Sequence, residues 1–385
     1  MRILPEHSFR PPGPVATMLA MLVVLVLAAC VPGGIGPQAP GGGREAVVSG
    51  LVRSIQGGPV AGADVRVAGG GSARTDAEGR FSITGVRPHE RAAVWVTSDS
   101  FATAATAYPV RAGYETVVYV DLIPAAPPQR LDASRGGRMP VGSGGSLQIE
   151  PGSLVDASGR PAQGTVLVRA TYIDPADPLH VQAAPGNYMA VDDRGGMRLL
   201  RTYGMVDITA TDASGARLSL APGRTATLDW PDAGGAGGAL YRLVDTGDWR
   251  YESQGPRLVP SLGVWNYDTD RTYVCLQVQV TPAAAGVVVR AHGTGYSTQG
   301  TTDKDGRVTL AVEPNATVIL RVPGSGLPGK GVQTSGPGQS YDGAMRCPAG
   351  ASTSATLDIP PASGLGVGRQ SHQLSGLYQW SRTQE

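Results

Sequence analysis

One glycine-rich stretch of this sequence has the residue types that bind phosphate. Residues 324–330 read GSGLPGK, the spacing of a loop in which glycine amides and a lysine surround an anion. Gly331 stands where such a loop needs Ser or Thr to hold Mg²⁺. The Gly and Pro residues that follow cannot open the helix whose N-terminus completes the anion site. We therefore interpret this stretch as a loop without nucleotide chemistry.

Aspartates crowd together at three places where a calcium ion could bind. These are Asp303 with Asp305, Asp174 with Asp177, and Asp192 with Asp193. An EF-hand loop that began at Asp303 would need a Glu at its twelfth position, where this sequence has Pro314. Capping of local turns by the Asp side chains is the favoured interpretation, with calcium binding as the alternative.

Residues for acid–base or nucleophilic chemistry are scattered. The sequence holds neither HExxH nor GxSxG, and the histidines after residue 30 are His89, His180, His292 and His372. Glu252 lies beside the aromatic residues Trp249 and Tyr251, which is a mild hint of a glycoside hydrolase, and we favour a place in a strand of the central region. The sequence therefore predicts no catalytic residue, no metal site and no cofactor, and we expect a protein that is not an enzyme.

The cysteine near the N-terminus has the best-defined chemistry. An apolar run over residues 18–27 follows two arginines and is far shorter than the ~20 residues of a spanning helix. It ends in LAAC at residues 27–30, which is the layout of a secretory signal. The sequence around the cut resembles the bacterial lipobox. That resemblance implies that residues 1–29 are removed and that Cys30 becomes an acylated N-terminus.

Acylation would decide the location of the protein. Several acyl chains anchor a protein firmly, because each buried methylene contributes about 0.8 kcal/mol. The lipobox resemblance implies sorting to the outer membrane, since Val31, and not Asp, follows the cysteine. We expect an exported protein that is anchored by lipid, on the periplasmic or the surface face of that membrane.

The other two cysteines, Cys275 and Cys347, are predicted to form a disulfide. Thiols outside the cytoplasm are more often bridged than free, and no CxxC pair or clustered His suggests zinc. The bridge would close a loop of roughly 70 residues, which is worth about 4 kcal/mol in the chain-entropy model. We expect its role to be structural.

Composition narrows the class of partner. The chain has 385 residues, a formal net charge of +1 and 16% charged residues, so no overall field attracts nucleic acid. Its 41% hydrophobic residues are enough for packed cores, and its length suggests two or three domains. We therefore expect no nucleic-acid partner.

Short extended runs dominate the chain after the N-terminal segment. They are rich in β-formers, alternate with Gly, Asp, Asn and Pro, and show no sustained helical periodicity. This pattern predicts an all-β protein of tandem β-sandwich modules. We expect flexible segments at residues 30–44, a Gly/Pro linker, and at the tail, residues 361–385.

The motif T-D-x-x-G-R occurs twice, at residues 75–80 and 302–307, each time followed by alternating apolar residues. Asp accepts backbone N–H groups at a turn, and Gly takes a positive φ angle. Both copies therefore predict a hairpin. Two copies indicate two similar modules on either side of a middle segment.

Residues 45–124 resemble a carboxypeptidase regulatory-like domain. The matching pieces are VSGLV at 48–52, PVAGADVRV at 59–67 and the first T-D-x-x-G-R motif. The resemblance implies a seven-stranded, transthyretin-like sandwich. Residues 271–360 are a looser match, expected to be a second such sandwich.

The central region, residues 130–270, is similar to cartilage-intermediate-layer-like proteins. The matching pieces are IEPGSLVD at 149–156, DPADP at 174–178, PGNYMA at 185–190, TYGMVDI at 202–208 and WNYD at 265–268. The resemblance implies a β-rich domain and offers no catalytic residue to carry over.

The tryptophans bear on whether the protein binds carbohydrate, because an exposed aromatic ring can stack on a sugar. Trp95 and Trp265 are expected in sandwich cores, whereas Trp249 could be buried or could stack on a sugar. We predict a non-catalytic scaffold or adhesion-type lipoprotein that contacts the membrane through its lipid and an envelope protein or polysaccharide through its loops. A carbohydrate-binding protein is the alternative, and a hydrolase is less favoured.

Overall fold

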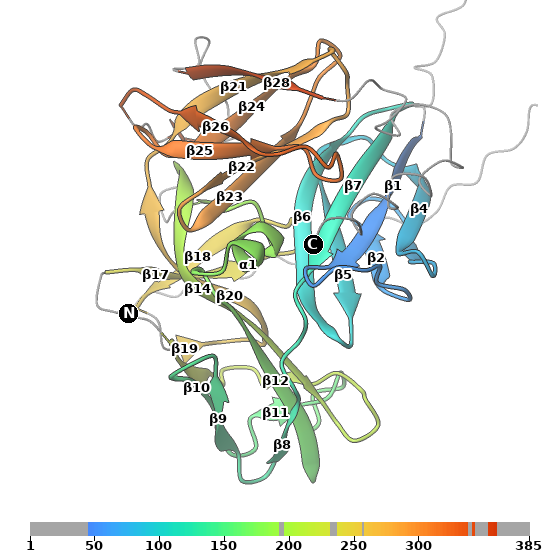
Figure 1. Cartoon of the computed structure of the whole chain (residues 1–385). Helices are drawn as coiled ribbons and strands as arrows, with labels where there is room; N and C mark the ends of the chain where they lie inside the picture. Colours follow the sequence, from blue (N-terminus) through green and yellow to red (C-terminus); the bar gives the residue numbers. More distant parts are fainter. Residues whose placement is uncertain are drawn as a thin grey trace, which may run out of the picture. The chain divides into compact units, whose positions relative to one another are not determined.

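The computed structural model describes residues 45–191, 196–231, 237–255, 258–337, 341–342 and 353–359. They form β-strands and a short helix, so the predicted all-β, sandwich-like fold is confirmed (Figure 1). No helix in these ranges is long and apolar enough to span a membrane. The predicted signal peptide, lipidated Cys30, linker and tail lie outside the described residues, as does Cys347.

The N-terminal module, residues 46–122, is a sandwich of two sheets. Its strands are β1 (Ala46–Ser54), β2 (Asp64–Val67), β3 (Ser72–Arg74), β4 (Arg80–Val86), β5 (His89–Ser98), β6 (Phe101–Val110) and β7 (Glu115–Leu122). One sheet has the order β4-β1-β7 and the other β3-β2-β5-β6. The β1–β7 pair is parallel, whereas the other pairs are antiparallel. Alternate residues such as Val48, Val52, Val65 and Val67 point into the core.

The C-terminal module repeats this topology. Its strands are β21 (Val274–Thr281), β22 (Val288–Gly293), β23 (Tyr296–Thr301), β24 (Arg307–Val312), β25 (Thr317–Arg321), β26 (Lys330–Gln333) and β28 (Thr353–Asp358). The sheet orders are β24-β21-β28 and β23-β22-β25-β26, and β21–β28 is again the parallel pair. Strand for strand, this is the arrangement of the N-terminal module.

The central region, residues 129–271, is built on a longer sheet. It contains β8 (Gln129–Asp132), β9 (Gly137–Val141), β10 (Gly145–Ile149), β11 (Leu154–Val155), β12 (Thr165–Ile173), β13 (Met189–Val191), β14 (Gly196–Thr211), β15 (Ser219–Leu220), β16 (Ala226–Asp229), β17 (Ala239–Leu243), β18 (Trp249–Gln254), β19 (Leu258–Val259), β20 (Gly263–Arg271) and helix α1 (Pro178–Ala183). The long sheet has the order β13-β18-β17-β20-β14-β12-β8, and β27 (Tyr341–Asp342) pairs with β14. A second sheet has the order β19-β16-β10-β9, and β11 pairs with β15.

Strand β14 contributes to two hydrophobic cores. Its first half, with Leu199 and Leu200, packs in a cluster shared with helix α1 and the C-terminal module. Its second half, with Val206 and Ile208, packs in a separate cluster of the central region. The pairing with β20 shifts register between Thr202 and Gly204, shortly before the strand changes core between Met205 and Val206.

The burial of the tryptophans differs in part from the prediction. Trp265 and Trp249 are buried, at 0% and 1% exposure. Trp95 is only partly buried, so its predicted place in the sandwich core is wrong. Strand alternation turns Val94 and Val96 inward, which leaves Trp95 on the outer face of β5.

Candidate ligand-binding groove

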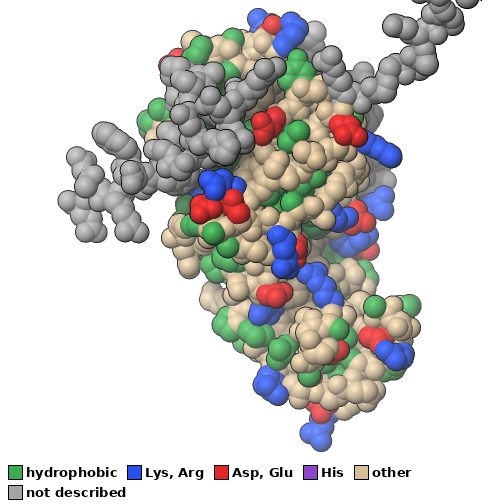
Figure 2. Space-filling model, turned by 90° about the vertical axis from the view of Figure 1, so that its right-hand side faces the viewer, with side chains coloured by type: hydrophobic (Ala, Val, Ile, Leu, Met, Phe, Trp, Pro, Cys, Tyr) green, Lys and Arg blue, Asp and Glu red, His purple; other side chains and the backbone are tan. Residues whose placement is uncertain are grey.

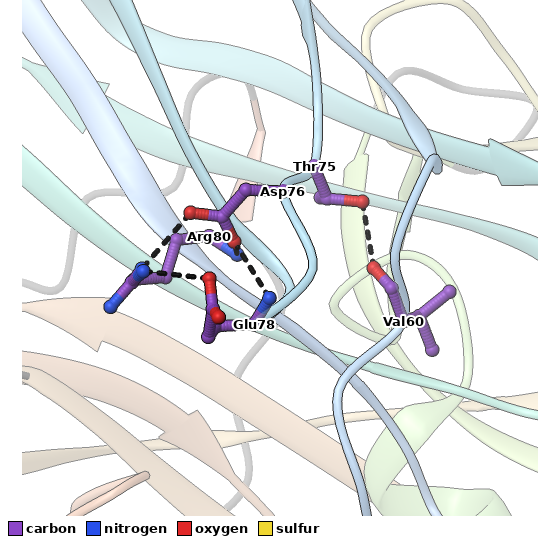
Figure 3. Close-up of polar contacts among 5 residues, drawn as sticks. All are labelled: Val60, Thr75, Asp76, Glu78 and Arg80. Carbon is purple, nitrogen blue, oxygen red and sulfur yellow. Dashed lines mark hydrogen bonds and ion pairs between the residues drawn. The ribbon is translucent and has the colours of Figure 1, made fainter. Parts of the chain in front are cut away.

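The predicted aspartate turn is present in both copies of the motif. In the first copy, Asp76 Oδ1 accepts the amides of Glu78 at 3.0 Å and Arg80 at 2.7 Å (Figure 3). In the second copy, Asp303 Oδ1 accepts the amides of Asp305 and Arg307, both at 2.9 Å. The carboxylates therefore serve the backbone of the turn.

The preceding threonine ties each turn to the segment that leads into β2 or β22. Thr75 Oγ1 donates to the Val60 carbonyl at 2.7 Å and accepts the Ala63 amide at 2.9 Å (Figure 3). Thr302 does the same with the Ala284 carbonyl and the Val287 amide. The threonine of the motif thus holds the aspartate turn against the segment before β2 in the first copy and before β22 in the second.

Two further turns of this kind escaped the sequence analysis. Asp156 Oδ1 accepts the amides of Ser158 and Arg160, and Asp212 Oδ1 accepts those of Ser214 and Ala216. Both begin with the letters DASG, a signal that was available in the sequence. Hydrogen bonds from the amide and side chain of Arg160 hold the pKa of Asp156 below its usual value.

The candidate calcium ligands that the structure describes are engaged in the same way. Asp174 Oδ1 accepts the Ala176 amide, and Asp177 Oδ1 accepts the Leu179 amide at the start of α1. The part of the chain that the structure describes contains no group of three or more His, Cys, Asp or Glu side chains that could hold a metal. Asp192 and Asp193 lie outside that part.

Two other predicted features have definite places. Lys330 begins strand β26 and donates Nζ to the Thr356 carbonyl at 2.6 Å, so the lysine of the phosphate-loop-like stretch serves the C-terminal module. Cys275 is buried in β21, at 4% exposure. Its proposed partner Cys347 lies outside the described residues, so their disulfide stays a prediction.

The central motifs converge on a buried polar cluster. Thr202 Oγ1 donates to Asn266 Oδ1 at 2.7 Å, and Asn266 Nδ2 donates to Asp268. Burial raises the pKa of Asp268 well above its usual value, because the charged form loses its hydration. These side chains are enclosed between β14 and β20 and are closed to a ligand from outside. We interpret the cluster as structural.

A groove of about 930 Å³ lies between the N-terminal module and the central region. One wall is the outer face of β2, β3, β5 and β6, and the other is formed by β12, β14, β15 and β20. Hydrogen bonds join the walls: the Thr103 amide donates to Asp207 Oδ2 at 2.7 Å, and Trp95 Nε1 donates to the Asp245 carbonyl at 3.1 Å. Arg91 pairs with Asp248 beside them.

Three arginines line this groove, from both walls. Arg66 comes from β2 and lies over the Trp95 ring, at 5.9 Å from its centroid. Arg169 comes from β12 and donates to the backbone carbonyl of Asp99. Arg217 comes from the turn between β14 and β15 and is exposed. Within the described residues neither Arg66 nor Arg217 forms an ion pair.

Two of the three carboxylates of the groove are paired or buried. Asp64 accepts two bonds from Arg74, at 2.8 and 3.3 Å. Asp207 is 3% exposed, and burial raises its pKa despite the bond from Thr103. Among the aspartates of the groove, Asp99 is exposed, and within the described residues its carboxylate accepts no hydrogen bond. The groove therefore presents a net positive charge.

Charge is mixed on one face of the molecule. On the face drawn in Figure 2, basic and acidic side chains are interspersed over the surface. This distribution agrees with the formal net charge of +1.

Comparison with known proteins covers parts of the chain. The chain is 41% identical over 88 residues to cartilage intermediate layer protein 2 of Mus musculus, which is 21% of this chain and 8% of that protein. The human protein is 38% identical over 80 residues, 20% of this chain and 7% of that one. The chain thus spans less than a tenth of the length of these relatives.

Similarity to solved structures is slight. The major pilin subunit BcpA of Bacillus cereus aligns with 82% of this chain and 99% of its own, at 9% identity and a TM-score of 0.19. Catechol 1,2-dioxygenase of Acinetobacter aligns with 24% of this chain and 56% of its own, at 12% identity and a TM-score of 0.19. Within the chain, residues 47–123 match the family model of the carboxypeptidase regulatory-like domain.

Proposed function

We propose that this chain is a non-catalytic binding protein of the bacterial cell envelope, anchored to the outer membrane through lipid on Cys30. The groove between the N-terminal module and the central region is the observation that carries the binding role. Its walls are faces of paired β-sheets, so the groove is preformed and suited to hold a ligand without rearrangement.

Two features support a non-catalytic role. The described lining of the groove offers arginines, hydroxyl groups and three carboxyl groups, of which Asp64 is paired with Arg74 and Asp207 is buried, and it has no histidine or cysteine. Glu252, which the sequence suggested as a weak hydrolase candidate, pairs with Arg242 at 3.5 Å on strand β18 and does not line the groove. An acid and a base placed on either side of a substrate would be needed for hydrolysis.

The anchor is tested by two substitutions in a host with two membranes. Cys30→Ser removes the acylated thiol, so we expect this variant to remain uncleaved or to leave the outer-membrane fraction. Val31→Asp preserves the cysteine, and we expect it to stay acylated but to move to the inner membrane. Mass spectrometry of the mature N-terminus and membrane fractionation measure both results. A wild-type protein without acyl chains on Cys30 would contradict the proposal.

Sugar stacking on the tryptophans singled out by the sequence is not supported. Trp249 and Trp265 are buried in the cores and have no ring face open to a ligand. Trp95 lines the groove, but Arg66 lies over its ring. A carbohydrate ligand would therefore be recognised mainly through polar and charged contacts.

A further inference from the structure

We propose that the groove binds a carboxylated glycan, a chain of uronic acid residues. This inference rests on the proposed binding function and names the ligand class for the same groove. Its first support is charge: Arg66, Arg169 and Arg217 face a space in which two of three aspartates are paired or buried. Guanidinium groups bind carboxylates through two parallel hydrogen bonds, which makes them suited to an acidic sugar.

The placement of the arginines on both walls favours an extended ligand. Arg66 belongs to the N-terminal module, whereas Arg169 and Arg217 belong to the central region. A chain with a carboxylate on each unit could meet arginines on both walls. The volume of about 930 Å³ accommodates several sugar units.

Uncommitted hydroxyl groups supply the second support. Within the described residues, the following side chains line the groove and make no hydrogen bond: Ser72, Thr97, Ser98, Thr209, Thr211 and Ser219. Hydroxyl groups both donate and accept, which matches the hydroxyl groups of a sugar. A surface that only attracted negative charge would not need them.

The sheet geometry disfavours an acidic peptide as the ligand. A peptide that adds to a sheet needs an open edge with free backbone N–H and C=O groups. Four strands of the walls, β2 and β5 on one side and β12 and β14 on the other, are paired along both edges, whereas β3 and β6 are the edge strands of their sheet. Over these four strands the groove presents side chains, which suits recognition through hydroxyl and carboxylate groups.

Binding of oligogalacturonate to the full chain in detergent tests this inference, with isothermal titration calorimetry as the measurement. We expect Arg217→Ala to weaken binding by about tenfold or more, because a charge-assisted hydrogen-bonded pair is lost. Arg66→Ala should weaken it as well, and raised salt should weaken it further. Arg111→Ala removes an exposed arginine of the N-terminal module outside the groove, so this control should bind like the wild type.

Two further probes test whether the groove recognises the carboxylate groups and the hydroxyl groups of the ligand. A neutral oligogalactan of equal length should bind at least tenfold more weakly, since it lacks the carboxylates. Polyglutamate of equal charge should also bind more weakly, and Thr97→Val with Thr209→Val should reduce the preference for oligogalacturonate over polyglutamate. Melting curves of each variant separate a loss of binding from a loss of folding.

Several outcomes would overturn the inference. These are the absence of oligogalacturonate binding, binding that Arg66→Ala and Arg217→Ala leave unchanged, and equal affinity for polyglutamate or for the neutral glycan. Such results leave the envelope role intact if Cys30 is acylated. Conversely, an unacylated protein that binds oligogalacturonate through Arg217 would contradict the proposed anchor and not the ligand.

Discussion

At the scale of single residues, the repeated turn shows how strictly the backbone selects its sequence. Asp is required because one carboxylate oxygen accepts two amides, as at Asp76 and Asp303. Gly is required because the residue three positions after the Asp has a positive φ, 74° at Gly79 and 75° at Gly306. The turn explains these residues completely, without a metal ion.

Substitution of two glycines of the N-terminal module can distinguish the cost of backbone strain from the cost of steric overlap. Gly69 has φ of +76° and nothing within 4 Å of an added Cβ, so Gly69→Ala should cost about 1 kcal/mol from backbone strain alone. Gly79 has φ of +74°, and its added Cβ would lie 2.3 Å from the Val52 carbonyl oxygen. We expect Gly79→Ala to cost about 1–3 kcal/mol more than Gly69→Ala, because strand β1 must move.

Urea denaturation of the two variants and the wild type measures this difference in the free energy of unfolding. Because both positions lie in the same module, they report on the same core. Equal destabilisation by the two substitutions would show that the close approach of the Gly79 turn to β1 does not matter.

Sequence reasoning found the turns where the flanking strands were also recognisable. The copies at Asp76 and Asp303 precede alternating apolar runs, whereas those at Asp156 and Asp212 each have a two-residue strand on one side, β11 before Asp156 and β15 after Asp212. Arg217, which follows the last of these turns, was missed as a groove residue for another reason. Its importance comes from its position opposite another module, and local sequence does not encode that.

At the scale of elements, the centre of β1 explains why its motif contains glycine. Gly50 lies between Phe81 of β4 and Val118 of β7, with its α-carbon facing the core. An added Cβ would lie 2.2 Å from the Val118 carbonyl oxygen and 2.8 Å from Val118 Cγ2. The strand can therefore pair on both sides only if this residue has no side chain.

We expect Gly50→Ala to lower the free energy of unfolding of the N-terminal module by about 2–3 kcal/mol, through overpacking and displacement of β7. Gly71→Ala is the matched control, since its Cβ would lie 3.5 Å from Ile83 Cγ2 in ordinary contact. Thermal unfolding followed by circular dichroism compares the two. A Gly50→Ala variant as stable as Gly71→Ala would mean that β1 and β7 separate at little cost.

Strand alternation predicted the cores well but failed where a module packs on its neighbour. In β5, Val94 and Val96 face the core, and Ala93 and Trp95 on the other face are apolar too. That second apolar set exists because the outer face of β5 packs toward the central region, where Trp95 bonds the Asp245 carbonyl. A period of two cannot tell which apolar face belongs to the sandwich and which to the interface.

At the scale of the whole described chain, buried charges join the N-terminal and C-terminal modules. Asp121 of β7 accepts hydrogen bonds from Arg53 and, across the interface, from Arg290 Nη1 at 3.3 Å. Arg290 Nη2 also donates to the Tyr119 carbonyl at 2.7 Å. Although burial opposes ionisation, the arginines lower the pKa of Asp121, so the pair stays charged.

The histidine beside this junction predicts how the molecule responds to acid. Burial together with Arg290 and Arg321 lowers the pKa of His292 to about 4, against a weaker opposite effect of Asp121. In the unfolded chain His292 is protonated as the pH falls through about 6.5, whereas in the folded chain it is protonated only at about pH 4. Protonation therefore favours unfolding, and the free energy of unfolding should fall by about 3 kcal/mol as the pH drops through this window.

His292→Gln should remove this loss, because glutamine does not titrate. Free energies of unfolding at pH 7 and pH 4.5 measure the change, and His89→Gln, at an exposed position of β5, serves as the control that should leave the loss in place. Parallel pH profiles of the wild type and His292→Gln would show that the junction admits a proton at no cost.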